Sequence, residues 1–226
     1  MGCFFMNKPD IKKISVASML TAVAFLCTFI FRFKVSFLTF DFKDAVISII
    51  SLLYGPVYGI ASAGLVAFFE MLSMSDTGLY GMIMNFLSSG TFALTCGIVY
   101  KYKRSFSGAI IAVIASAVSV TSVMMLANIF ITPHYIGATS ADVIKLIPPL
   151  LLPFNLSKAI INAAVILIIY KPVTSVLKRT GLLKSRDVAV QKKRSAVLFV
   201  IAIIVIILTA LFLILKMGGS FEIFRS

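Results

Sequence analysis

The sequence predicts an all-α integral membrane protein, because it is unusually apolar and its charges are gathered between long apolar runs. The 226 residues are 60% hydrophobic and 13% charged, with a mean hydropathy of +1.07. Soluble domains hold about 45–50% apolar and about 25% charged residues. Lys and Arg cluster around residues 8–13, 101–104 and 171–194. This positive-inside pattern predicts a multi-pass protein of the cell membrane with a cytoplasmic N-terminus.

The net charge of +13 therefore indicates contact with a lipid bilayer, not with nucleic acid. A nucleic-acid-binding protein would show a basic stripe interleaved with stacking aromatic residues, and the sequence has none.

The first apolar run, residues 14–31, is predicted to be the first membrane span. It is longer than the apolar part of a signal peptide and has no clear cleavage site. Residues 33–43 are rich in β-branched and aromatic residues and predict a structured external loop. The runs 44–53 and 57–73 are short for independent spans of about 20 residues. Gly55-Pro56 breaks the chain between them, so they predict a helical hairpin.

Three further helices are predicted at 82–100, 107–131 and 151–170. An external turn at 75–81 precedes the first of them, and Pro133 is expected to end the second. Residues 134–149, which include Pro148-Pro149, are expected to form an external loop. The resulting domains are a cytoplasmic segment (1–13), a six-helix membrane domain (14–171), a basic cytoplasmic linker (172–195) and a terminal segment (196–226). Within the last segment, the run 196–215 predicts an additional C-terminal transmembrane helix.

Polar side chains at membrane depth are costly, and each is a candidate for function. Asn155, Lys158 and Asn162 are spaced by three and four residues, which places them on one face of the sixth helix. Lys158 either pairs with Glu70 of the third helix or extends to the external interface. The two flanking Asn residues favour a polar cavity.

Asn128 lies near the external end of the fifth helix, at the depth of Asn155. Its amide suits the edge of a heterocyclic imide or amide, or a hydrogen bond between helices. Asp44 stands where a helix N-cap belongs. Asp41 is expected either to cap the same helix or to line the mouth of a site.

No enzyme, metal site or cofactor is predicted. The sequence lacks HExxH, CxxC, a Ser-His-Asp set and a phosphate-binding loop. Uphill transport by this chain would therefore draw its energy from a partner or from an ion gradient.

Four motifs in the expected order resemble the S-components of energy-coupling factor (ECF) vitamin transporters, and among these the riboflavin-binding type. They are Leu-Thr-Phe-Asp-Phe-Lys-Asp at 38–44, Tyr-Gly-Pro-Val-Tyr-Gly at 54–59, Asn128 followed by Ile-Thr-Pro-His-Tyr at 131–135, and Pro-Phe-Asn-Leu-Ser-Lys at 153–158. The resemblance covers residues 10–180. It implies a six-helix S-component bundle whose vitamin site opens outward.

The resemblance also implies roles for individual residues. Asn128, Asn155 and Lys158 would hydrogen-bond the isoalloxazine ring, and Asp41 with its neighbour Phe40 would close over it. Asn162 shares the face of Asn155 and Lys158 and is a further candidate for substrate binding. Ser18 and Ala22 match the small-x-x-x-small element that contacts the coupling subunit in that family.

The implied partners are riboflavin, a transmembrane coupling subunit and two ATPase subunits. Another vitamin or an FMN-like flavin stays open as the substrate. A self-sufficient secondary transporter coupled to protons through Glu70 or Asp44 is a second hypothesis, and a membrane sensor or scaffold is a third.

Overall fold

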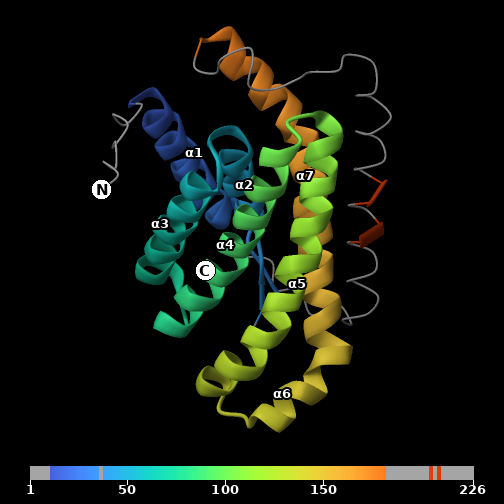
Figure 1. Ribbon diagram of the computed structural model, residues 1–226. Coiled ribbons are helices and arrows are strands. Elements are labelled where there is room, and N and C mark those ends of the chain that lie inside the picture. Colours follow the sequence, from blue (N-terminus) through green and yellow to red (C-terminus); the bar gives the residue numbers. More distant parts are fainter. Residues whose placement is uncertain (1–10, 36–37, 182–203, 206–207, 210–226) are drawn as a thin grey trace, which may run out of the picture.

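The computed structural model describes residues 11–35, 38–181, 204–205 and 208–209, which form a bundle of helices around one small β-hairpin (Figure 1). The additional helix predicted at 196–215 lies outside the described residues, apart from 204–205 and 208–209, which are helical. The elements in chain order are α1 (Ile11–Ile30), β1 (Phe33–Val35), β2 (Leu38–Phe40), α2 (Lys43–Tyr54), α3 (Pro56–Met74), α4 (Gly78–Tyr102), α5 (Phe106–Ile136), α6 (Ser140–Leu146), the π-helix η1 (Ile147–Leu151) and α7 (Leu152–Arg179).

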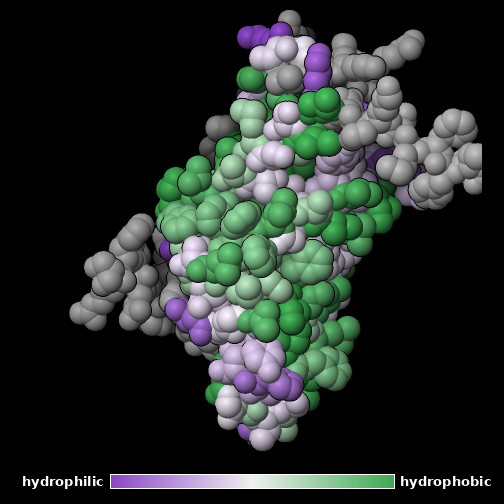
Figure 2. All heavy atoms as spheres, turned by 90° about the vertical axis from the view of Figure 1, so that its left-hand side faces the viewer, coloured by the Kyte–Doolittle hydropathy of each residue, from purple (hydrophilic) through white to green (hydrophobic). Residues whose placement is uncertain are grey.

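Five helical stretches in the described part of the chain are long and apolar enough to cross a membrane. They are α1, α3, α4, α5 and the continuous stretch Ser140–Leu177. Apolar residues cover the middle of the face shown in Figure 2, and hydrophilic residues gather toward its two ends. The predicted all-α fold with several helices able to cross a membrane is therefore confirmed, whereas the count of six helices plus one is not.

Helix α2, the second helix in the chain, is too short to span a bilayer. Its 12 residues extend about 18 Å at 1.5 Å per residue, against a hydrocarbon core of about 30 Å. All residues from Lys43 to Leu52 are buried, and the helix contacts α1, α3, α4 and α7. In such a central position the polar residues of α2, such as Lys43 and Asp44, must find partners inside the bundle.

The predicted break between the second and third helices is confirmed. Gly55 has a φ of 104°, which favours glycine, and Pro56 begins α3 where no backbone donor is needed. Near this turn the Ser51 hydroxyl of α2 donates to the Ala93 carbonyl of α4 at 2.6 Å. Helix α3 packs closely against both, because a Cβ at Gly59 would lie 2.7 Å from Ser51 and 3.1 Å from Ala93.

The predicted structured loop at 33–43 contains an antiparallel β-hairpin, with Phe33 opposite Phe40 and Val35 opposite Leu38. Figure 1 shows the hairpin among the helices of the bundle.

The prediction that Pro133 ends the fifth helix was wrong. Helix α5 continues to Ile136, and Gly137 terminates it in the left-handed conformation. A proline removes only one intrahelical hydrogen bond. The turn after Pro133 is held by a stacked contact between His134 and Tyr80 of α4, with ring centroids 5.6 Å apart.

The prediction of a loop at 134–149 was also wrong for most of its length, since α6 and η1 occupy residues 140–151. The Thr139 side chain caps α6 by accepting from the Asp142 backbone N–H at 3.3 Å. Pro148 and Pro149 lie in the wide turn of η1, where their missing donors interrupt the regular α-helical ladder. Helix α7 then passes the predicted end at residue 170 and continues through Pro172 to Arg179.

The two ends of the bundle differ in charge. The α2–α3 turn, the α4–α5 turn and the end of α7 lie at one end, and the α3–α4 turn and α6 lie at the other (Figure 1). The first of these ends carries the basic segment 101–104 and Lys171.

Candidate functional site

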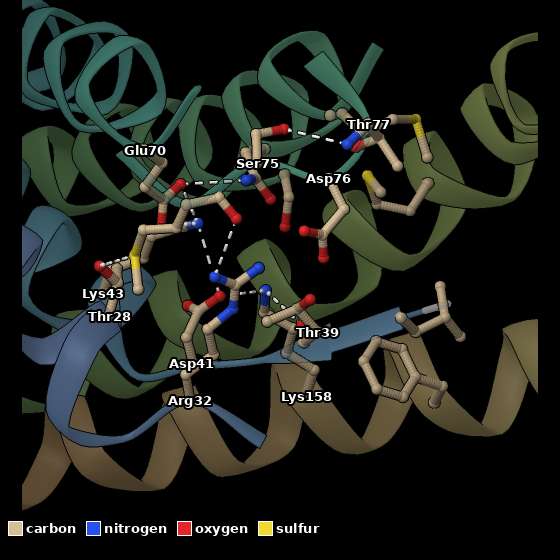
Figure 3. A pocket seen from close by; sticks show the side chains of 18 of the residues that line it. Thr28, Arg32, Thr39, Asp41, Lys43, Glu70, Ser75, Asp76, Thr77 and Lys158 are labelled. Atoms are coloured by element: carbon tan, nitrogen blue, oxygen red, sulfur yellow. Dashed lines mark hydrogen bonds and ion pairs between the residues drawn. The ribbon is translucent and has the colours of Figure 1, made fainter. Parts of the chain in front are cut away.

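A cavity of about 250 Å³ lies between the hairpin and the surrounding helices, toward the end of the bundle that holds the α3–α4 turn (Figure 3). Its wall combines apolar and charged side chains. The apolar lining residues are Leu38, Met74, Met84, Met124 and Phe154, and the polar ones are Thr28, Arg32, Thr39, Asp41, Lys43, Glu70, Ser75, Asp76, Thr77, Asn85, Ser88, Tyr135, Asn155 and Lys158, with Gly81 completing the wall.

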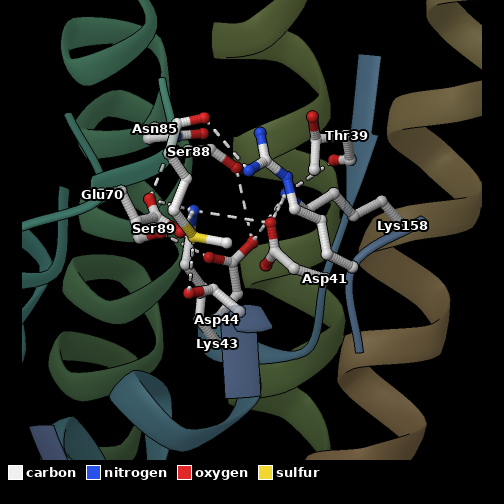
Figure 4. Close-up of polar contacts among 12 residues, drawn as sticks. Thr39, Asp41, Lys43, Asp44, Glu70, Asn85, Ser88, Ser89 and Lys158 are labelled. Carbon is white, nitrogen blue, oxygen red and sulfur yellow. Dashed lines mark hydrogen bonds and ion pairs between the residues drawn. The ribbon is translucent and has the colours of Figure 1, made fainter. Parts of the chain in front are cut away.

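Four charged side chains of the wall form a continuous buried chain of ion pairs, in the order Lys158, Asp41, Lys43 and Glu70 (Figure 4). Lys158 Nζ lies 3.1 Å from Asp41 Oδ2, and Lys43 Nζ lies 3.4 Å from the same oxygen. On its other side Lys43 donates to both carboxylate oxygens of Glu70, at 2.6 and 2.7 Å. Buried ions are tolerated when they are paired in this way. The β2–α2 turn, α2, α3 and α7 are thereby joined at one point.

Glu70 pairs with Lys43, so the expected pair between Glu70 and Lys158 was wrong. Glu70 also accepts from the Asn85 amide at 3.0 Å. Lys158 does not extend to the interface, because only 7% of the residue is exposed and its ammonium group points to Asp41.

Asp44 does not cap α2, contrary to the prediction. The helix begins one residue earlier, with Phe42 at the N-cap position, which places Asp44 within the first turn. Its carboxylate accepts from Ser89 and, at 3.5 Å, from Ser88, and lies 3.8 Å from Lys158 Nζ. Asp44 therefore belongs to the buried polar cluster beneath the cavity.

Asp41 lies in the turn between β2 and α2, outside the membrane-spanning helices. Burial favours its neutral form, but the adjacent ammonium groups of Lys158 and Lys43 outweigh burial and lower the pKa of this carboxyl below its ordinary value. Both ammonium groups face Oδ2. The other oxygen, Oδ1, is buried and has no hydrogen-bond partner among the described residues. A buried acceptor in a cavity wall is a place for a ligand donor.

Three of the six residues predicted to bind substrate line the cavity, namely Asp41, Asn155 and Lys158. The Asn155 amide donates to the Leu151 carbonyl at 2.8 Å, within its own helix.

The other three residues are buried but are not part of the lining. Asn162 accepts from the Ala45 backbone N–H at 3.0 Å and donates to the carbonyl oxygens of Asp41 and Lys158, each at 3.1 Å. It fixes the start of α2 and the Asp41 turn against α7. Phe40 packs against Phe154, with ring centroids 6.3 Å apart.

Asn128 is connected to the cavity only through intermediates. Its side chain donates to the Met124 carbonyl and accepts from Thr132, whose hydroxyl lies 3.1 Å from that of Tyr135. Tyr135 lines the cavity.

Sequence reasoning did not assign Lys43, Arg32 or Asn85 to the site. Lys43 carried a usable signal, since it follows Asp41 by two residues in an otherwise aromatic segment. Arg32, in the link between α1 and β1, and Asn85 of α4 reach the cavity through tertiary packing, which the sequence does not reveal. Arg32 donates to the Met74 carbonyl at 3.2 Å.

Comparisons with known proteins identify the family. Residues 12–170 match the model of the ECF transporter, substrate-specific component. The chain is 33% identical to the riboflavin transporter RibU of Staphylococcus aureus (strain TCH60), over 77% of this chain and 96% of that protein. It is 29% identical to the riboflavin transporter FmnP of Bacillus subtilis (strain 168), over 71% of this chain and 90% of that protein.

A solved structure, described as the S component of a bacterial ECF transporter, superposes with a TM-score of 0.63 at 32% identity. The match covers 74% of this chain and 98% of the other. The chain therefore belongs to the substrate-specific S components of ECF transporters, and it is a membrane transport protein, not an enzyme.

Proposed function

We propose that this S component captures riboflavin at the external face of the cell membrane and delivers it with separate subunits: a transmembrane coupling subunit and two ATPases. One observation carries the proposal. The cavity sets an apolar wall of Leu38, Met124 and Phe154 against the polar groups of Asn155 and Lys158. A flat heterocycle with an imide edge needs both kinds of surface.

The relatives support flavin as the substrate class. Two proteins that match this chain over 71% and 77% of its length are named as riboflavin transporters. An FMN-like flavin or another vitamin is the alternative substrate.

The charge distribution supports an external opening and a cytoplasmic N-terminus. The basic segment 101–104 and Lys171 lie at the end of the bundle opposite the α3–α4 turn. Lys and Arg mark cytoplasmic segments. The cavity, whose wall includes Ser75, Asp76 and Thr77 of the α3–α4 turn, then faces outward.

The surface of α1 supports docking of a coupling subunit. Ser18 and Ala22 are exposed and lie one turn apart on the same face. Small residues at this spacing allow two helices in a membrane to approach closely.

Binding is tested with the purified protein in detergent, by titrating riboflavin and recording the quenching of its fluorescence. We expect saturable binding, which Lys158→Met and Asn155→Ala weaken strongly. Lys145→Met, at an exposed position on α6, serves as the matched control and leaves binding unchanged. Absence of quenching by the unaltered protein would disprove the riboflavin assignment. Competition by FMN and by unrelated vitamins identifies the preferred ligand.

Energy coupling is tested separately in liposomes. Liposomes that hold this chain alone are expected to show no gradient-driven riboflavin uptake, because an S component depends on its ATPase partners. Uptake driven by a proton gradient would instead support the secondary-transporter hypothesis.

A further inference from the structure

We propose that Glu70 is a positioning residue for the ligand: through Lys43 it holds the Asp41 carboxylate so that Oδ1 accepts a hydroxyl of the ligand's polyol side chain. This inference rests on the proposed function, since riboflavin carries such a chain on its ring system.

The first observation is the way the Asp41 carboxylate is held. Its Oδ2 atom receives both neighbouring ammonium groups, from Lys158 at 3.1 Å and from Lys43 at 3.4 Å. Its Oδ1 atom is fully buried and has no hydrogen-bond partner in the described part of the chain, and Asp41 as a residue lines the cavity. A buried carboxylate oxygen without a donor costs free energy, and a ligand hydroxyl at this place would relieve that cost.

The second observation is that Glu70 is committed to protein donors. Both of its carboxylate oxygens accept from Lys43, at 2.6 and 2.7 Å, and one also accepts from Asn85 at 3.0 Å. Glu70 therefore acts on the ligand through Lys43, which lies between the two carboxylates (Figure 4).

The third observation is the order of the distances. Lys43 lies closer to Glu70, at 2.6 Å, than to Asp41, at 3.4 Å. If the charge of residue 70 is removed, Asp41 becomes the nearest carboxylate partner of a fully buried ammonium group. Lys43 then turns toward Asp41 and competes with the ligand for its oxygens, because a buried ion needs a counter-ion.

The position of Asp41 favours a polyol over the ring as its ligand group. The charged and amide part of the wall comprises Arg32, Asp41, Lys43, Glu70, Asp76, Asn85, Asn155 and Lys158, whereas Leu38 and Phe154 belong to its apolar part. A chain of hydroxyl groups needs many polar neighbours, and a ring needs apolar surface.

The test compares riboflavin with lumiflavin, which has the same ring system but a methyl group in place of the polyol chain. The measured quantity is the dissociation constant of lumiflavin divided by that of riboflavin, both determined by fluorescence quenching. A high ratio means a preference for riboflavin. Glu70→Gln is expected to weaken riboflavin binding about tenfold or more, the effect of one hydrogen bond to a charged group, and to leave lumiflavin binding nearly unchanged. Loss of both ligands by the same factor would indicate a purely structural role and overturn the inference.

A double variant provides the rescue. Glu70→Gln combined with Lys43→Met removes the competing ammonium group together with its partner, so the preference for riboflavin should recover relative to Glu70→Gln alone. No recovery would overturn the inference.

Should Glu70→Gln fail to fold, Glu70→Asp is the variant to measure. It keeps the charge but moves it away from Lys43, so it should lower the ratio of the lumiflavin to the riboflavin dissociation constant to a smaller extent. An unchanged ratio in a folded Glu70→Asp protein counts against the inference.

Asp142→Asn is the matched control, because Asp142 is an exposed carboxylate in an ion pair on α6 and is not part of the cavity wall. It should leave the ratio unchanged. Failure of the unaltered protein to bind either flavin would overturn the proposed function and this inference together. Flavin binding with an unaltered ratio in Glu70→Gln would overturn the inference alone.

Discussion

The ammonium group of Lys158 lies 3.1 Å from Oδ2 of Asp41, although 117 residues separate the two in the chain. Both side chains are buried, with 9% and 2% of their surface exposed. This pair joins the turn after the β-hairpin to α7 and forms part of the cavity wall. The shape of the cavity and the stability of the bundle therefore depend on the same contact.

Lys158→Met is expected to lower the free energy of unfolding by about 3–5 kcal/mol, because it leaves the Asp41 charge buried with one partner fewer. The measurement is thermal unfolding in detergent without ligand. Lys145 is a matched control, since its ammonium group also lies 3.1 Å from a carboxylate, that of Asp142, but on the surface. Lys145→Met should change stability by about 0–1 kcal/mol. Equal effects of the two substitutions would contradict the role of burial.

Asn162→Leu is expected to destabilise the ligand-free protein by about 2–4 kcal/mol. The substitution keeps the approximate volume but removes three hydrogen bonds that fix Ala45, Asp41 and the backbone of Lys158. Chemical or thermal unfolding measures the effect.

Thr121→Val is the control for Asn162→Leu, because Thr121 is also buried but donates only to Ala117 in its own helix. It should cost about 1 kcal/mol or less. A stability loss for Asn162→Leu no larger than this would show that Asn162 does not anchor the turn.

Gly97→Ala is expected to destabilise the bundle, by about 1–3 kcal/mol, as overpacking of a close helix contact does. An added Cβ would lie 2.3 Å from the Ser51 hydroxyl and 3.0 Å from backbone atoms of Pro56.

Gly90 lies on the same helix, two turns earlier, and provides the comparison for Gly97. A Cβ at Gly90 would make only ordinary contacts, at 3.7 Å or more, with Phe86. Gly90→Ala should be neutral or stabilising, by up to about 1 kcal/mol, because alanine favours the helix. The two thermal unfolding midpoints should therefore move apart, and a parallel decrease would contradict the close contact at Gly97.

The hydroxyl groups of Tyr100 and Tyr170 lie 2.6 Å apart in the buried core, at the end of the bundle remote from the cavity. Tyr170→Phe should cost about 1–3 kcal/mol, since it leaves the Tyr100 hydroxyl without its buried partner. Changing both residues to Phe should cost less than the two single changes combined, which a double-mutant cycle measures. Riboflavin affinity should stay the same in all three variants, and a change in affinity would show that this pair is coupled to the site.

The sequence predicted those parts of the fold that follow from local chemistry. Long apolar runs predict membrane helices because a bilayer demands about 20 apolar residues with internally satisfied backbone groups. The break at Gly55-Pro56 was predicted because this dipeptide interrupts a helix, and in the structure glycine supplies the positive φ and proline begins the next helix. The errors at Pro133 and at 134–149 came from treating prolines as helix ends. Contacts such as that of His134 with Tyr80 override this local preference.

For the site, the sequence by itself determined which polar residues fall within or beside apolar runs, and it predicted Asn155, Lys158 and Asp41, which do line the cavity. The spacing of residues on one helix is fixed by helix geometry, so Asn162 was correctly placed beside Lys158. Which partner each charge takes was decided only by the tertiary structure. Glu70 was expected to form an ion pair with Lys158, but it forms one with Lys43. Asp44 was expected to cap a helix, but its carboxylate accepts a hydrogen bond from Ser89. A buried charge binds whichever counter-charge the packing of other helices brings within reach. The partners lie 27 residues apart for Lys43 and Glu70 and 117 apart for Asp41 and Lys158, and no local pattern records such a choice.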